Sequence, residues 1–265
     1  MDSLHVQDVM QKHSACVNDN DFMTYARQLM RDYHHKILPV VNENKIVLGV
    51  ISEKDVLNIT STKSNITVKG FVTETPVITE YMNLKQTAKI LSESGFTAIP
   101  VVYSLDDRTL KGVISVVDIF NNLNPLNIPE NIIDESMTRN VKTCTPDEPL
   151  AKIWNNMIRE GYSGYPVVDK HNFPLGMITR RDIINSGKIR IEREDEHGTR
   201  IGTSTNVSRI MSTPSYNISP EASIRDAIEM MIKYDVGRLC VVDQDKLVGI
   251  IDKHDVVRVY SNESP

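Results

Sequence analysis

At residues 166–182 the chain reads PVVDKHNFPLGMITRRD. An apolar, β-prone run is followed by a glycine and then by Thr-x-x-Asp, with six residues from the glycine to the aspartate. The pattern occurs three more times with the same spacing: Pro39-Val40-Val41, Gly49, Ser52 and Asp55; Pro100-Val101-Val102, Gly112, Ser115 and Asp118; Cys240-Val241-Val242, Gly249, Asp252 and Asp255. Internal repeats that preserve a polar pair indicate an array of equivalent folding units or of equivalent binding sites.

The residues around each copy predict the same small unit. A short β-prone stretch precedes an amphipathic helix, and two strands joined by a polar turn, then a short helix, complete the unit. The helical apolar positions are three and four apart, which places them on one face: Phe22, Ala26, Leu29, Met30 and Tyr33 in the first repeat; Leu150, Ile153, Trp154, Met157 and Ile158 in the third; Ile224, Ala227, Ile228 and Met231 in the fourth. We therefore predict an α/β fold of four tandem β-α-β-β-α units.

Each unit, at roughly 60 residues, is too small to bury a secure core alone, so neighbouring units are expected to pair. The predicted pairs are residues 1–124, with repeats at about 6–60 and 68–124, and residues 130–265, with repeats at about 133–187 and 206–262. Prolines and asparagines at 121–131 predict a linker between the pairs. Residues 187–206, which are mixed in charge, predict a long loop or β-excursion.

Composition narrows the class of protein. A chain of 265 residues with 40% hydrophobic and 25% charged residues is typical of a globular protein. No apolar run is long enough for a bilayer and no signal-peptide pattern opens the chain, so no membrane association and a cytoplasmic location are expected. Cys16, Cys144 and Cys240 are expected to be reduced, packed thiols. The histidines show no spacing typical of a nucleophile or a metal site, so no enzyme activity, catalytic cofactor or metal is predicted.

Together these features resemble the cystathionine β-synthase (CBS) domain family, and the resemblance covers nearly the whole chain. It implies that the four units pair into two Bateman modules, as in the γ subunit of AMP-activated kinase and in archaeal four-repeat proteins, and a homodimer is expected. It also implies clefts that bind an adenosyl-containing small molecule without transforming it: AMP, ADP or ATP, or S-adenosylmethionine.

The Ser/Thr-x-x-Asp tetrad has a structural interpretation and a functional one. As a capping box, its first residue caps the next helix, and its aspartate side chain reaches back to the backbone N–H of that first residue. Asp252 suits the first position because Asp is a good N-cap. Asp is shorter than the usual Glu, so its carboxylate is freer to face outward, and a helix N-terminus favours a phosphate. The resemblance implies that the hydroxyl contacts phosphate and the aspartate contacts ribose. Both roles can hold together.

The third repeat is predicted to carry the tightest site. Arg180 and Arg181 lie between Thr179 and Asp182, and cations at a helix N-terminus oppose its dipole, which favours an anionic partner. Glycines and tyrosines just before the apolar run could approach and stack on a base, although a tyrosine at such a position is more often part of the core. The further candidates in this repeat are Thr143, Ser163, Gly164, Tyr165 and Pro166.

The other repeats supply fewer cations. Candidates in the first are Ser52, Lys54 and Asp55. His34-His35-Lys36 could add positive charge to that site, but we interpret it as a solvated helix end. In the second, Ser115 and Asp118 enclose two valines, so that cleft is expected to be empty or to take a ligand of low negative charge. Candidates in the fourth are Arg238, Lys253, His254 and Asp255, whose cations offset in part the carboxylate of Asp252.

The predicted function is reversible binding of adenine nucleotides by a non-catalytic sensor whose conformational change is read by an unidentified regulated protein. One alternative is a sensor of S-adenosylmethionine or another adenosyl ligand. A second is an RNA- or ribosome-associated protein, although the net charge of −5 makes nucleic acid an unexpected partner. Its basic patch, Arg180, Arg181, Lys188, Arg190, Arg193 and Arg200, is largely offset by Glu192, Glu194, Asp195 and Glu196. Nucleotide hydrolysis, a third, has no supporting motif.

Overall fold

The computed structural model describes residues 4–59, 65–123, 128, 130–186, 193–194, 200–201 and 205–262. Each predicted unit is present. The first repeat contains β1 (Val17–Asn18), α2 (Met23–Tyr33), β2 (Ile37–Val41), β3 (Val47–Ser52) and α3 (Glu53–Asn58), and the second contains β4 (Ile78–Thr79), α4 (Leu84–Ser94), β5 (Ala98–Val102), β6 (Leu110–Ser115) and α5 (Val116–Phe120). The third contains α6 (Leu150–Glu160), β7 (Gly164–Val168), β8 (Pro174–Thr179) and α7 (Arg180–Asn185), and the fourth contains β11 (Asn217–Ile218), α8 (Ile224–Lys233), β12 (Arg238–Asp243), β13 (Lys246–Asp252) and α9 (Lys253–Asn262).

The sheets of the four units share one topology. The first strand pairs in parallel with the second, as in Val17 with Val40, and the second pairs antiparallel with the third. In the third repeat the first strand is reduced to a single parallel bridge between Cys144 and Val167. The α/β prediction of four β-α-β-β-α units is confirmed, with this one shortened strand.

Neighbouring units exchange the segments that precede them. The N-terminal segment with α1 (Val6–Val9) lies on the second repeat, where Gln11 bridges Val113, and the segment with η1 (Val68–Phe71) lies on the first repeat. The same exchange links the third and fourth repeats through η3 (Ile133–Glu135) and η4 (Val207–Arg209). Each repeated glycine marks the crossing: a Cβ at Gly112 would stand 2.6 Å from the carbonyl oxygen of Gln11. The glycine is therefore required by close backbone approach.

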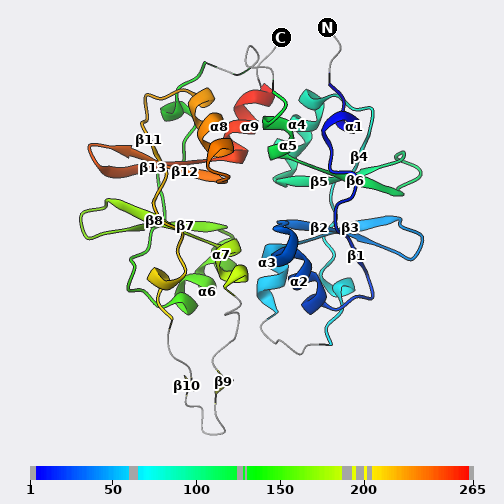
Figure 1. Ribbon diagram of the computed structural model, residues 1–265, viewed down its shortest axis with the longest axis horizontal. Coiled ribbons are helices and arrows are strands. Elements are labelled where there is room, and N and C mark those ends of the chain that lie inside the picture. The colour runs from blue at the N-terminus through cyan, green and yellow to red at the C-terminus, as the bar shows by residue number, and fades with distance from the viewer. Residues whose placement is uncertain are drawn as a thin grey trace.

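Two large cores hold the molecule together, and each joins units from opposite halves of the chain. One core combines residues of the first and third repeats, and the other combines the second and fourth. Figure 1 shows the two halves side by side, with helices facing one another along the midline and β-hairpins pointing outward. Within each half, sheet packs against sheet, as in the cluster of Ile37, Val50, Ala98 and Val113. All four units thus meet at the centre.

One expectation, on the buried face of the first helix, is wrong. Phe22 and Tyr33, placed on the buried face of the first helix, are 48% and 60% exposed; they lie at its two ends, and Met23, Ala26 and Met30 form the buried face. Within 187–206, β9 (Arg193–Glu194) and β10 (Arg200–Ile201) pair antiparallel, in agreement with a β-excursion. Most of that segment, and residues 124–127 and 129 of the predicted linker, lie outside the described residues.

The remaining predictions on composition concern cysteines and membranes. Cys144 and Cys240 are buried free thiols, and Cys16 is a free thiol that is partly exposed. In the described ranges, no helix combines the length and the apolarity that crossing a bilayer requires.

Candidate functional site

A cavity of about 680 Å³ lies where the four repeats meet. Its volume is in the range of small-molecule sites. Six basic and four acidic side chains are found in its described lining: Lys36, Lys54, Arg180, Arg181, Arg238 and Lys253, against Glu53, Asp182, Asp235 and Asp252. Ser52, Ser163, Thr179 and His254 also line it. From the described part of the second repeat, only uncharged residues line it: Gly95, Phe96 and Thr97.

The tetrad of the third repeat is a complete capping box. The backbone N–H and the hydroxyl of Thr179 donate to one carboxylate oxygen of Asp182, at 2.7 and 2.5 Å, and the hydroxyl accepts from the N–H of Asp182 at 3.2 Å. The other oxygen of Asp182 accepts from the hydroxyl of Ser212 at 2.8 Å. The carboxylate expected to face outward is therefore already held by donors on both oxygens. A ribose hydroxyl would have to share or replace the Ser212 contact.

The second repeat shows the same box with a different second donor. Ser115 and Asp118 cap α5, and the side-chain amide of Gln11 donates to both oxygens of Asp118, at 3.1 and 3.2 Å. Neither Ser115 nor Asp118 lines the central cavity. In the first repeat, Ser52 and Asp55 form the box, and of these two Ser52 lines the cavity.

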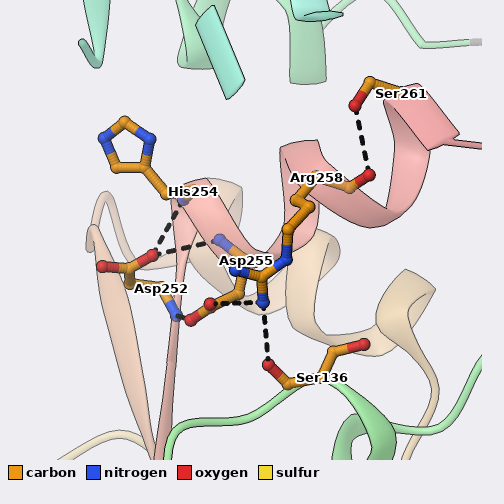
Figure 2. Close-up of polar contacts among 6 residues, drawn as sticks. All are labelled: Ser136, Asp252, His254, Asp255, Arg258 and Ser261. Carbon is orange, nitrogen blue, oxygen red and sulfur yellow. Dashed lines mark hydrogen bonds and ion pairs between the residues drawn. The ribbon is translucent and has the colours of Figure 1, made fainter. Parts of the chain in front are cut away.

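In the fourth repeat the box is built from two acids (Figure 2). The carboxylate of Asp252 accepts from the N–H groups of His254 and Asp255, at 2.8 and 3.2 Å. Asp255 in turn is bound by Arg258 at 3.0 Å and lies away from the cavity. Burial, and then the nearby Asp252, raise the pKa of Asp255 to about 6. Figure 2 shows the imidazole of His254 pointing away from both carboxylates.

The two arginines of the third repeat have different partners. Arg180 is 9% exposed, and its guanidinium donates to the carbonyl oxygens of Gly161 and Met157, at 2.7 and 3.3 Å, at the end of α6. Arg181 lies at the cavity wall, and its described ion pair is a loose one, 4.0 Å from Asp235. Arg181 is therefore the more available cation. Arg180 holds a helix end.

Arg238 crosses from the fourth repeat to the third. Its guanidinium donates to the hydroxyl of Ser163 at 2.6 Å. Gly164 leaves room for this crossing, because a Cβ at Gly164 would collide with the guanidinium. Ser163 and Gly164, selected as candidates for base contact, thus position a cation at the cavity.

Three other candidates lie away from the cavity. Tyr165 is 3% exposed in the core, and its hydroxyl donates to Glu160 at 3.2 Å. Pro166 pairs with Met177 within the β7–β8 ladder. Thr143 is exposed and lines a separate, shallower pocket with Asn172. The ring of Tyr165 is not available for stacking on a base in this conformation.

The sequence interpretation missed Glu53 at the centre and did not select Lys36 as a site residue. Lys36, interpreted as part of a solvated helix end, lines the cavity, and burial lowers its pKa. Glu53, the first residue of α3, is 9% exposed; burial raises its pKa while Lys36 opposes that rise. Burial, and then Lys36, lower the pKa of Lys253 to about 8, and burial lowers the pKa of His254. Cations crowded in this way, with lowered pKa values, are typical of a functional site.

No cluster of three or more His, Cys, Asp and Glu side chains in the described ranges could hold a metal ion.

Four stretches of the chain match the CBS domain: residues 6–61, 68–124, 131–188 and 207–262. The chain belongs to the CBS domain family. Its CBS domains are the four structural repeats, so the predicted family is confirmed. The crystal structure of MJ1225 from Methanocaldococcus jannaschii superimposes with a TM-score of 0.81 at 24% identity, covering 97% of this chain and 100% of that one.

Two curated relatives extend this comparison of CBS domains. Protein MJ1404 of Methanocaldococcus jannaschii is 25% identical over 260 residues, which cover 96% of this chain but 61% of that protein. CBS domain-containing protein YhcV of Bacillus subtilis is 32% identical over 133 residues, covering 50% of this chain and 88% of that one. The chain therefore spans less than two thirds of the length of MJ1404.

Proposed function

We propose that the chain binds an adenine nucleotide, AMP, ADP or ATP, reversibly in the central cavity and acts as a non-catalytic sensor. The observation that carries the proposal is the convergence of basic side chains from three CBS domains on one cavity, where two of the four acids, Asp182 and Asp252, are held by capping hydrogen bonds. A guanidinium or ammonium group that is partly shielded from water binds a phosphate well, since hydrogen bonds between charged groups are the strong ones. MJ1225 is described as a proposed archaeal homologue of g-AMPK, in line with this reading.

Binding at this position offers a route from ligand to conformation. Lys36 belongs to the first half of the chain, whereas Arg181, Arg238 and Lys253 belong to the second. A phosphate that contacts both sides would stabilise the arrangement in which the two halves bring these cations together. A ligand shifts a conformational equilibrium by its differential affinity for the two states. The packing between halves, read by an unidentified partner protein, is the proposed output.

The alternatives differ in what the cavity must accept. S-Adenosylmethionine carries a sulfonium cation, which the excess of basic groups disfavours. The RNA-binding alternative depends on a basic patch. Within that patch Arg180 is buried, and the structure does not describe the side chains of Lys188, Arg190, Arg193 and Arg200. A homodimer and a cytoplasmic location stay predictions; light scattering of the purified protein tests the first.

The test is a thermal-shift and calorimetry panel with AMP, ADP, ATP, adenosine and S-adenosylmethionine. We expect the nucleotides to stabilise the protein more than adenosine or S-adenosylmethionine does. Stabilisation by S-adenosylmethionine alone, or by none of these, would overturn the proposal. Two further measurements separate the other classes: phosphate release from ATP would indicate an enzyme, and a salt-dependent gel shift would indicate RNA binding.

A further inference from the structure

The central cavity contains one buried acid in its described lining. Glu53 is 9% exposed, whereas Asp182 and Asp252 are held by capping hydrogen bonds and Asp235 is 79% exposed at the rim. Glu53 follows Ser52 directly, so the turn into α3 fixes its backbone at the cavity wall. No described cation lies within ion-pair distance of its carboxylate. Glu53 is therefore a buried acid that lies among the cations of the site without an ion-pair partner in the described residues.

The cations that act on Glu53 overlap with those proposed to bind phosphate. Lys36, Arg180, Arg181 and Arg238 all favour its ionised form, in that order of strength after burial, which disfavours it. Of these, Arg180 is committed to the end of α6. The remaining three are shared between Glu53 and a bound phosphate. A phosphate in this cavity would be repelled by the ionised carboxylate of Glu53. Repulsion between like charges is stronger inside a protein than in water.

We propose that Glu53 is a specificity-determining residue that reduces affinity in proportion to the negative charge of the ligand. The inference rests on the proposed function and adds which phosphate count the site favours. ATP carries more negative charge than AMP, so the carboxylate of Glu53 opposes ATP more strongly. The basic groups alone would favour ATP; Glu53 shifts the balance toward AMP. In the empty protein the same carboxylate reduces repulsion among Lys36, Arg181 and Arg238.

The test compares Glu53→Gln with Glu43→Gln, an equal charge change on the exposed β2–β3 turn of the same repeat. Affinities for ATP, AMP and adenosine are measured by calorimetry on the full chain. We expect Glu53→Gln to bind ATP about tenfold more tightly than the wild type and AMP at most about threefold more tightly. Its affinity for adenosine should be unchanged. Glu43→Gln should match the wild type throughout. An unchanged ratio of ATP to AMP affinity in Glu53→Gln, or weaker ATP binding, overturns the inference.

A separate arm distinguishes this inference from the proposed function. If the wild type binds no adenine nucleotide, the proposed function fails, and inorganic tripolyphosphate then tests Glu53 directly. Stabilisation by tripolyphosphate that is larger for Glu53→Gln than for the wild type and Glu43→Gln would support the role of Glu53 as an opposing charge. Equal stabilisation of all three proteins would overturn it. Thermal unfolding without ligand establishes that each variant is folded.

Discussion

The guanidinium of Arg238, at the start of β12, donates a 2.6 Å hydrogen bond to the hydroxyl of Ser163, which immediately precedes β7 in the neighbouring CBS domain. One domain therefore supplies a cation to the cleft edge of the other. Gly164 is part of this arrangement, because any side chain there would collide with the guanidinium.

Replacing Arg238 with Gln should weaken ATP binding about tenfold or more and leave adenosine binding nearly unchanged, since only the phosphates use the cation. Calorimetry with both ligands measures the difference. Arg209→Gln makes the same substitution at an exposed position on η4 and is the matched control. Equal losses for ATP and adenosine would mean that Arg238 shapes the cleft without contacting phosphate.

Asp182 and Asp118, which have the same capping role in two different repeats, provide a second comparison. Asp182→Ala and Asp118→Ala each remove a capping box, so each should lower the free energy of unfolding by about 1–2 kcal/mol. Asp182 lines the central cavity and Asp118 does not, so only Asp182→Ala should also weaken AMP binding, by roughly 1–3 kcal/mol. Denaturant unfolding and calorimetry give the two quantities. A loss of AMP affinity in Asp118→Ala as large as that in Asp182→Ala would contradict the assignment.

Arg180 and Arg181 should separate into a stability residue and a ligand residue. Arg180→Met leaves the carbonyl oxygens of Gly161 and Met157 without their donor and should lower the free energy of unfolding by roughly 1–3 kcal/mol, with the ratio of ATP to adenosine affinity unchanged. Arg181→Ala should have little effect on unfolding and should selectively weaken ATP. The reverse assignment would be shown by a selective loss of ATP affinity in the Arg180 variant.

The cavity should bind nucleotide more weakly as the pH rises. Burial lowers the pKa of Lys253 to about 8, so Lys253 loses its charge between about pH 7 and about pH 9, and phosphate binds the charged form. The unfolded chain keeps that proton to a higher pH, so the unfolding free energy of the empty protein should rise with pH over the interval above the folded-state pKa. Affinity and stability thus change in opposite directions. Lys253→Met should flatten both profiles; unaltered profiles would assign them to another group.

The sequence predicted the repeat architecture because the residue spacing within each unit is sufficient to indicate its strands and helices. The spacing of Gly176, Thr179 and Asp182 encodes a strand and a helix start, and neither needs information from elsewhere in the chain. That Gly176 is also a crossing point was not predicted, because the crossing segment with Ser212 lies far along the chain. The stripe on α2 was wrong at Phe22 and Tyr33 because helical periodicity does not show where a helix begins and ends.

The site was predicted less completely, for a physical reason. Lys36 and Glu53 are ordinary surface residue types in the sequence; only the packing of the first repeat against the third and fourth encloses them. Arg180 and Arg181 are adjacent in sequence, yet α7 directs one to the end of α6 and the other to the cavity. Partners from distant segments decided both outcomes.

The exchange of leading segments has a consequence for how such a chain can be divided. The residues that complete the second repeat, with α1 and Gln11, precede the first repeat in the chain, and those that complete the first lie between the two. A single repeat excised at its apparent sequence boundaries would lack the leading segment that packs on it. It would also keep a leading segment whose packing surface belongs to the neighbouring repeat. The smallest fragment with every such edge satisfied is a pair of repeats, which makes the pair, and not the single repeat, the natural unit of duplication and of recombination.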